Sequence, residues 1–188
     1  MKSPYQDLRS ALFDARNSCD LWWLLIGAHD QRNEVIDGFE QLPVIYATLN
    51  PALYTSFIIK LCSVFGTGSH DITLKTVPKA ELDPEFARIW EIGRRLYKLR
   101  SKVVAHMDKR CDPDQIAKDT GLTYNGLRQF LADTVSLFDR IAAINGERGV
   151  NDFGLSDEFP RLLKQLRRGE EETEKVETQQ PLSAALFT

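Results

Sequence analysis

Apolar residues recur every three or four positions along most of the chain, which is the spacing of helices that bury one face. The first such stretch follows Ser3-Pro4, where a serine N-cap and a proline at the first helical position favour a helix start. Trp22 and Trp23 belong to this stretch, so we expect them in the core or a dimer interface rather than stacked on bases. The apolar positions are Tyr5, Leu8, Leu12, Ala15, Cys19, Trp22 and Ile26. Their alternating steps predict a long helix packed lengthwise in a bundle.

Two further helical stretches are predicted before residue 66. Residues 35–49 are amphipathic, with a kink or break near Pro43. Asn50-Pro51 is expected to cap the next helix, which Gly66 ends. Residues 72–77 alternate like a short strand, but no partner strand is present, so we predict an extended linker. The helix expected to start at Asn50-Pro51 has an apolar face that comprises Tyr54, Phe57, Ile58, Leu61, Val64 and Phe65.

The most informative helical pattern runs from Asp83 to Arg110 and starts with the cap and proline of Asp83-Pro84. Its apolar stripe comprises Phe86, Ile89, Trp90, Gly93, Leu96, Tyr97, Val103, Val104 and Met107. Arg100 occupies the slot between Tyr97 and Val103. A guanidinium keeps its charge and is costly to bury unpaired, so Arg100 needs a carboxylate, a phosphate or an interface. His106 lies about 120° round the helix and about 9 Å along it, towards the basic face of Arg95, Lys98, Lys102 and Lys109.

Residues 114–131 allow two interpretations. The spacing of a small residue, a turn glycine and a later apolar residue is typical of a helix-turn-helix, with Arg128 facing DNA. Gly126 would then weaken the recognition helix, and one arginine is few for a phosphate backbone. We therefore favour a bundle helix with Thr123 as its N-cap. Its apolar stripe comprises Leu127, Phe130, Leu131, Thr134, Leu137, Phe138, Ile141 and Ile144.

These patterns predict an all-α fold, an antiparallel bundle of about five to six helices. We expect one helical domain over residues 1–168 and an acidic, polar tail with an apolar end over 169–188. The net charge of −3 gives no global attraction to nucleic acid, so RNA binding requires a local basic patch. Three scattered cysteines argue for reduced thiols and against a zinc site, and no cofactor motif is present. No signal peptide or membrane span is recognised, so a cytoplasmic location is expected.

The segment Leu99-Arg100-Ser101-Lys102-Val103-Val104-Ala105-His106-Met107-Asp108 resembles the R-x(4–6)-H motif of the HEPN superfamily, and is most similar to its abortive-infection (AbiU-like) branch. HEPN domains are small all-α bundles that commonly dimerise so that two motifs face each other. The residue after the arginine is most often asparagine in that superfamily, whereas it is Ser101 here.

The resemblance implies a metal-independent RNA endonuclease of a toxin–antitoxin or abortive-infection system. Arg100 and His106 would be its catalytic pair, with Ser101 in support, and Arg95, Lys98, Lys102 and Lys109 would bind RNA. Because the two catalytic residues diverge on one helix, we expect a composite site in a homodimer. A cognate antitoxin would be a further partner. The alternatives are a non-catalytic module that binds a nucleotide or a protein, and a DNA-binding regulator that uses residues 115–130.

Overall fold

A computed structural model describes residues 3–27, 43–66, 72–105 and 121–150. All of them lie in one compact unit, Met1–Phe153. They form four α-helices: α1 (Pro4–Ile26), α3 (Pro43–Ser63), α4 (Phe86–Ala105) and α6 (Tyr124–Ile144). Two 3₁₀ turns, Leu74–Thr76 and Ala80–Leu82, precede α4, and the described ranges contain no strand. The predicted all-α fold is confirmed. The predicted domain boundary at residue 168 lies outside the described residues and stays a prediction.

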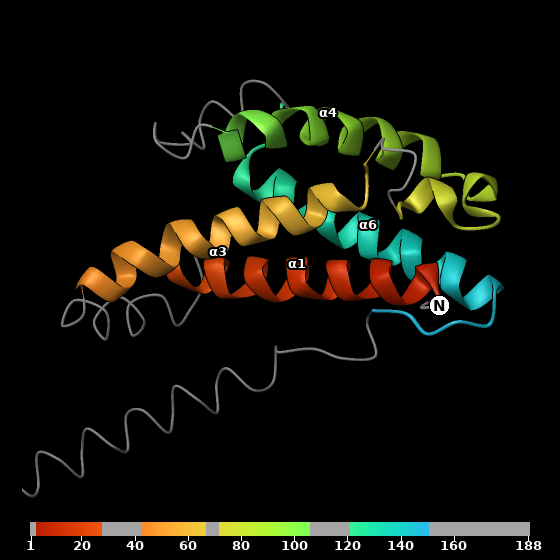
Figure 1. Cartoon of the computed structure of the whole chain (residues 1–188), viewed down its shortest axis with the longest axis horizontal. Helices are drawn as coiled ribbons and strands as arrows, with labels where there is room; N and C mark the ends of the chain where they lie inside the picture. The colour runs from red at the N-terminus through yellow and green to blue at the C-terminus, as the bar shows by residue number, and fades with distance from the viewer. Residues whose placement is uncertain (1–2, 28–42, 67–71, 106–120, 151–188) are drawn as a thin grey trace, which may run out of the picture. The chain divides into compact units, whose positions relative to one another are not determined.

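The four helices form an antiparallel bundle (Figure 1). α1 packs against α3 and α6, and α4 packs against the same two helices. In Figure 1, α1 and α4 run in one direction and α3 and α6 in the other. The bundle therefore has an α3–α4 edge and an α1–α6 edge on opposite sides, and these two edges carry the candidate sites.

The predicted apolar stripes form the core. On α1, every predicted position from Tyr5 to Trp22 is buried, whereas Leu25 is buried in place of Ile26. On α6, every predicted position from Leu127 to Ile141 is buried, but Ile144 is 59% exposed. Thr123 caps α6 as predicted, because its hydroxyl accepts a hydrogen bond from the Gly126 N–H at 3.1 Å. The bundle-helix interpretation of residues 123–144 is confirmed, and residues 106–120 lie outside the described part of the chain.

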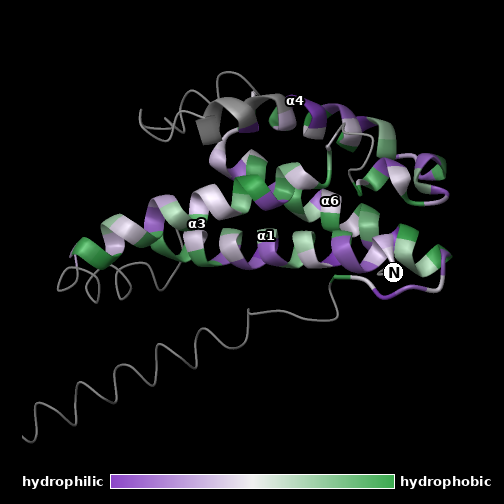
Figure 2. Cartoon of the chain, in the orientation of Figure 1, coloured by the Kyte–Doolittle hydropathy of each residue, from purple (hydrophilic) through white to green (hydrophobic). Residues whose placement is uncertain are grey.

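The predicted helix start at Asn50-Pro51 is wrong. α3 begins at Pro43 and continues through Pro51. Asn50 lies inside this helix, and its side-chain oxygen accepts a hydrogen bond from the Trp22 indole N–H at 3.1 Å. Of the described helices, α3 alone has the length and apolar composition of a membrane span. Its second half is core, whereas its first half exposes Val44 and Ile45. Figure 2 colours the first turn of α3 as hydrophobic.

The connection from α3 to α4 is less extended than the alternation of residues 72–77 predicts. Leu74–Thr76 forms a 3₁₀ turn, and the Leu74 N–H donates to the Val64 carbonyl at 3.0 Å. The Thr76 hydroxyl and the Thr73 backbone bond each other in both directions, at 2.7 and 3.1 Å. These bonds satisfy the backbone locally, so no partner strand is needed.

α4 begins at Phe86, slightly later than predicted, after a turn that Asp83 caps. The Asp83 carboxylate accepts a hydrogen bond from the Glu85 N–H at 2.9 Å. Further along, Gly93 lies directly against the ring of Phe65, and a Cβ added at this position would overlap that ring. This close approach sets how α4 sits on the end of α3, two turns before Arg100.

Candidate functional site

Arg100 lies on α4 at the α3–α4 edge of the bundle. It follows the buried residues Ile89 and Leu96 of the α4 stripe and is itself half-buried. Its guanidinium carbon lies 5.7 Å from the centre of the Tyr97 ring. Burial raises the pKa of the Cys62 thiol on α3 to about 12, and the charge of Arg100 partly opposes this rise. Arg100 is therefore close enough to α3 to act on a core thiol.

No carboxylate within the described ranges forms an ion pair or hydrogen bond with Arg100. Its contact there is with the Tyr97 ring, which does not neutralise a guanidinium. Of the partners that the sequence allowed for Arg100, an acid from the described residues is thus not used. A phosphate, an interface or an acid from the rest of the chain stays open.

The remaining predicted site residues are described only in part. Arg95 is exposed, and its Nε lies 3.7 Å from the Glu91 carboxylate one turn earlier. Ser101, Lys98 and Lys102 belong to α4, but their side chains lie outside what the structure describes. His106 and Lys109 follow the last described residue of α4. The proximity of these residues to Arg100 therefore stays a prediction.

Two other arginines show what a fully paired guanidinium looks like in this fold. Arg140 on α6 donates two hydrogen bonds to the Asp83 carboxylate, at 2.8 and 3.0 Å. Arg88 on α4 donates to Glu85 at 2.7 Å and to Asp133 of α6 at 2.8 Å. Asp83 is only 6% exposed, and the Arg140 hydrogen bonds hold the pKa of its carboxyl below the ordinary value.

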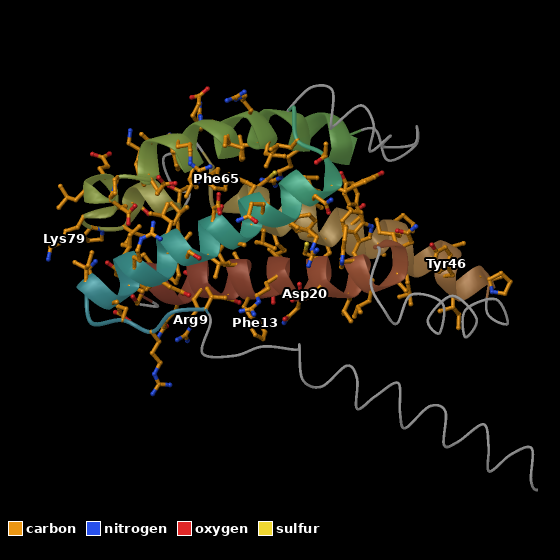
Figure 3. The ribbon with its side chains drawn as sticks, turned by 180° about the vertical axis from the view of Figure 1, so that it is seen from behind. Arg9, Phe13, Asp20, Tyr46, Phe65 and Lys79 are labelled. Carbon is orange, nitrogen blue, oxygen red and sulfur yellow. The ribbon has the colours of Figure 1, made fainter. Side chains whose placement is uncertain are left out.

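A cavity of about 490 Å³ lies at the opposite edge, between α1 and α6. Its polar lining includes Arg16 and Asp20 from α1 and Asn125, Arg128 and Ser136 from α6. Arg128 places its guanidinium carbon 4.1 Å from the centre of the Trp23 ring. Figure 3 shows Asp20 on the side of α1 along which α6 runs. Burial raises the pKa of the Asp20 carboxyl, and the charges of Arg16 and Arg128 partly offset this.

Sequence reasoning missed this cavity. It placed both tryptophans in an apolar run, and Trp22 is indeed buried, but Trp23 is only partly buried beneath Arg128. The signal in the sequence was the polar set on one side of the first helix, Arg16 and Asp20, four residues apart. That set alone does not indicate which helix faces it.

The sequence matches the family model for AbiU2, a HEPN family, over residues 5–146. This range spans nearly all of the described bundle and includes Arg100 and His106. The chain belongs to the HEPN AbiU2 family. The predicted resemblance is thereby confirmed, and the chain is a HEPN-like protein of an abortive-infection family. Searches of curated proteins and of solved structures found no match.

The described part of this AbiU2 chain offers no metal centre, because no three histidine, cysteine or acidic side chains gather there. Cys19 and Cys62 are buried free thiols, and Cys111 lies outside the described residues. Burial raises the pKa of the Cys19 thiol to about 12, so the thiolate needed for metal binding or nucleophilic attack is strongly disfavoured.

Proposed function

We propose that this AbiU2 chain is a metal-independent endoribonuclease that acts in abortive infection or as the toxin of a toxin–antitoxin pair. The observation that carries the proposal is Arg100, a half-buried guanidinium on α4 that bonds no acid among the described residues. Such a cation retains its donors for an external anion. RNA supplies that anion as a phosphodiester.

The chemistry requires a base that takes the 2′-OH proton and a cation that stabilises charge building on the phosphorus-bound oxygens. Histidine titrates near neutral pH and suits the first task, which the HEPN motif assigns to His106. Arginine presents a planar fork to phosphate oxygens and suits the second, which falls to Arg100. The 2′-oxygen attacks phosphorus, the bond from phosphorus to the 5′-oxygen breaks, and a proton is returned to that oxygen, so the expected products carry a 2′,3′-cyclic phosphate and a 5′-hydroxyl. Ser101 would support the pair as a nearby polar group.

Binding of the RNA backbone is assigned to the basic face of Arg95, Lys98, Lys102 and Lys109. The N–H donors and ammonium groups of this face would contact phosphates rather than bases, so binding would weaken steeply with salt. Arg100 and His106 point to different sides of an ideal helix, so the working site is proposed to be shared across a homodimer. A cognate antitoxin and a cytoplasmic location remain part of the proposal.

The test is incubation of the purified chain with labelled RNA in excess EDTA, followed by analysis of the product ends. The wild type is expected to cleave and to leave cyclic phosphates, and Arg100→Ala and His106→Ala are each expected to abolish cleavage. Matched controls are Arg94→Ala on the same helix and His70→Ala, neither of which has an assigned role. Both controls should cleave as the wild type does.

Thermal unfolding of each variant separates chemistry from structure. Loss of cleavage with unchanged melting supports the nuclease. Absence of cleavage by the wild type at every protein concentration, together with unfolding of Arg100→Ala, would instead identify Arg100 as a structural residue and overturn the proposal.

A further inference from the structure

We propose that the cavity between α1 and α6 binds the phosphate group of a phosphate ester, carried either by a free nucleotide or by an RNA strand. The cavity lies at the edge of the bundle opposite the α3–α4 edge of Arg100. The inference does not depend on the nuclease activity, and it stands or falls on binding alone.

Arg128 supplies the main binding group. Its guanidinium carbon lies over the Trp23 ring, 4.1 Å from the ring centre, in a cation–π contact. A guanidinium carries five N–H donors, and the ring supplies no conventional hydrogen-bond acceptor for them. Within the described residues no acceptor bonds them. The tryptophan thus holds a charged fork in place with its donors still available to an anion.

Further donors face the same cavity. Arg16 contributes a second guanidinium from α1, where its Nε lies 3.8 Å from the Asp20 carboxylate. Asn125 and Ser136 of α6 also line the cavity, and neither has a hydrogen-bond partner among the described residues. Gln129 lines it too, but its amide already donates to Asp133 at 2.8 Å. Donors therefore converge from two facing helices.

The charge and size of the cavity favour a phosphate ester over a simple carboxylate. Two guanidiniums outweigh one carboxylate, Asp20, which is the only acid among the described residues of the lining. A tetrahedral phosphate presents acceptors in several directions and can use donors on both helices, whereas one planar carboxylate is satisfied by one fork. The volume of about 490 Å³ leaves room for the attached organic group and falls within the range of about 300–1,000 Å³ of small-molecule sites.

Asp20 allows the proposal to predict the direction in which phosphate affinity changes. Its carboxylate is the charge that an incoming phosphate must approach, so removal of this charge should strengthen phosphate binding. Removal of Arg128 should weaken it. A ligand that instead used Asp20 as its acceptor would show the opposite response to the Asp20 change.

The experiment is calorimetric titration of the full chain with adenosine monophosphate and, separately, with a 2′-O-methyl RNA octamer that cannot be cleaved. Arg128→Ala should weaken binding by at least about tenfold, and Arg128→Lys by less, because lysine keeps the charge and loses the fork. Asp20→Asn should tighten binding about two- to tenfold. Arg148→Ala, an exposed arginine outside the cavity, should bind as the wild type does.

The two probes distinguish the sources of the phosphate. Binding of the mononucleotide alone assigns a free nucleotide. Tighter binding of the octamer that Arg128→Ala weakens assigns a strand to this cavity. The proposal is overturned if neither probe binds at millimolar concentration, if Arg128→Lys and Arg128→Ala both bind like the wild type, or if Asp20→Asn weakens binding. Arg100→Ala should leave binding of the mononucleotide at this cavity unchanged, so a failure of the phosphate-site proposal can be distinguished from a failure of the nuclease proposal.

Discussion

Four arginines of α4 and α6 form two contrasting pairs. Arg88 and Arg140 bond carboxylates of the neighbouring helix or of the turn before α4. The guanidinium carbons of Arg100 and Arg128 lie 5.7 and 4.1 Å from the centres of aromatic rings, and neither arginine bonds an acid among the described residues. The same side chain thus clamps helices where it meets an acid, and keeps its donors available where it meets a ring.

The two pairs also differ in position. The contacts of Arg88 with Asp133 and of Arg140 with Asp83 set the antiparallel register of α4 and α6. At about 1.5 Å per residue, the same register places Arg100 level with the start of α6, near Thr123. Arg128 lies on the first turns of α6. One end of the bundle is therefore closed by ion pairs, and the available guanidiniums gather at the other.

The strongest way to break this comparison is Arg100→Ala. Loss of one positioned donor to a developing oxyanion commonly costs about 10²–10³ in rate, and we expect RNA cleavage to fall at least that far. The free energy of unfolding should change by less than about 1 kcal/mol, because no described acid loses its partner. Cleavage rates and urea unfolding of the same preparation measure both. A large loss of stability with cleavage retained would place Arg100 with the clamping pair.

Arg140→Ala should show the reverse behaviour. The change leaves the nearly buried Asp83 without two hydrogen bonds, which is expected to lower the free energy of unfolding by about 1–3 kcal/mol. Cleavage and phosphate binding should persist under conditions where the variant is folded. The comparison of urea midpoints with Arg94→Ala as the control tests this, and equal midpoints would show that the ion pair contributes nothing.

A low pH should first destabilise the end of the bundle that the ion pairs of Arg88 and Arg140 hold together. The hydrogen bonds from Arg140 lower the pKa of Asp83 in the folded protein, so folding is favoured by the ionised carboxylate. This stabilisation is present above about pH 4 and is lost as the pH falls through the folded-state pKa. Burial opposes ionisation of Asp133, but hydrogen bonds from Arg88 and Gln129 outweigh it and also leave its pKa lowered.

Urea unfolding between pH 3 and pH 7 measures this loss. The Arg140→Ala variant should show a shallower dependence on pH below about pH 4, because the pKa of Asp83 would return towards its ordinary value. An unchanged pH profile in the variant would contradict the assignment to this pair.

The smallest expected effect concerns Asp20 in the α1–α6 cavity. Burial raises its pKa against the pull of Arg16 and Arg128, so its ionised form disfavours folding slightly at neutral pH. Asp20→Asn should therefore raise the free energy of unfolding, by less than about 0.5 kcal/mol because the side chain is 39% exposed. The gain should vanish at acidic pH, where Asp20 is protonated. If Asp20→Asn instead lowered the free energy of unfolding, the ionised Asp20 carboxylate would be shown to stabilise the fold.

The fold was largely predictable from the sequence, because helical periodicity and caps are local signals. Thr123 and the apolar stripes of α1 and α6 could be assigned from spacing alone. The continuation of α3 through Pro51 could not, since Asn50 bonds Trp22, 28 residues away in the sequence, and such a tertiary contact is invisible to local patterns. Tertiary contacts decided that boundary.

The candidate sites were predictable to different extents. Arg100 stood out as a cation within an apolar stripe, and that anomaly is visible in one helix. Arg128 did not, because its significance arises from Trp23 on a distant helix and from the cavity between them. Sequence patterns reveal the face of a single helix, whereas a cavity requires knowledge of which two faces meet.

The contact of Gly93 with Phe65 has a consequence for any chemistry on α4. Because the ring fills the space where a side chain would project, α4 cannot rotate about its axis or slide along α3 without lifting that ring. The close packing of Gly93, seven residues before Arg100, therefore fixes the direction in which Arg100 points. Any side chain at this position would require the Phe65 ring to move.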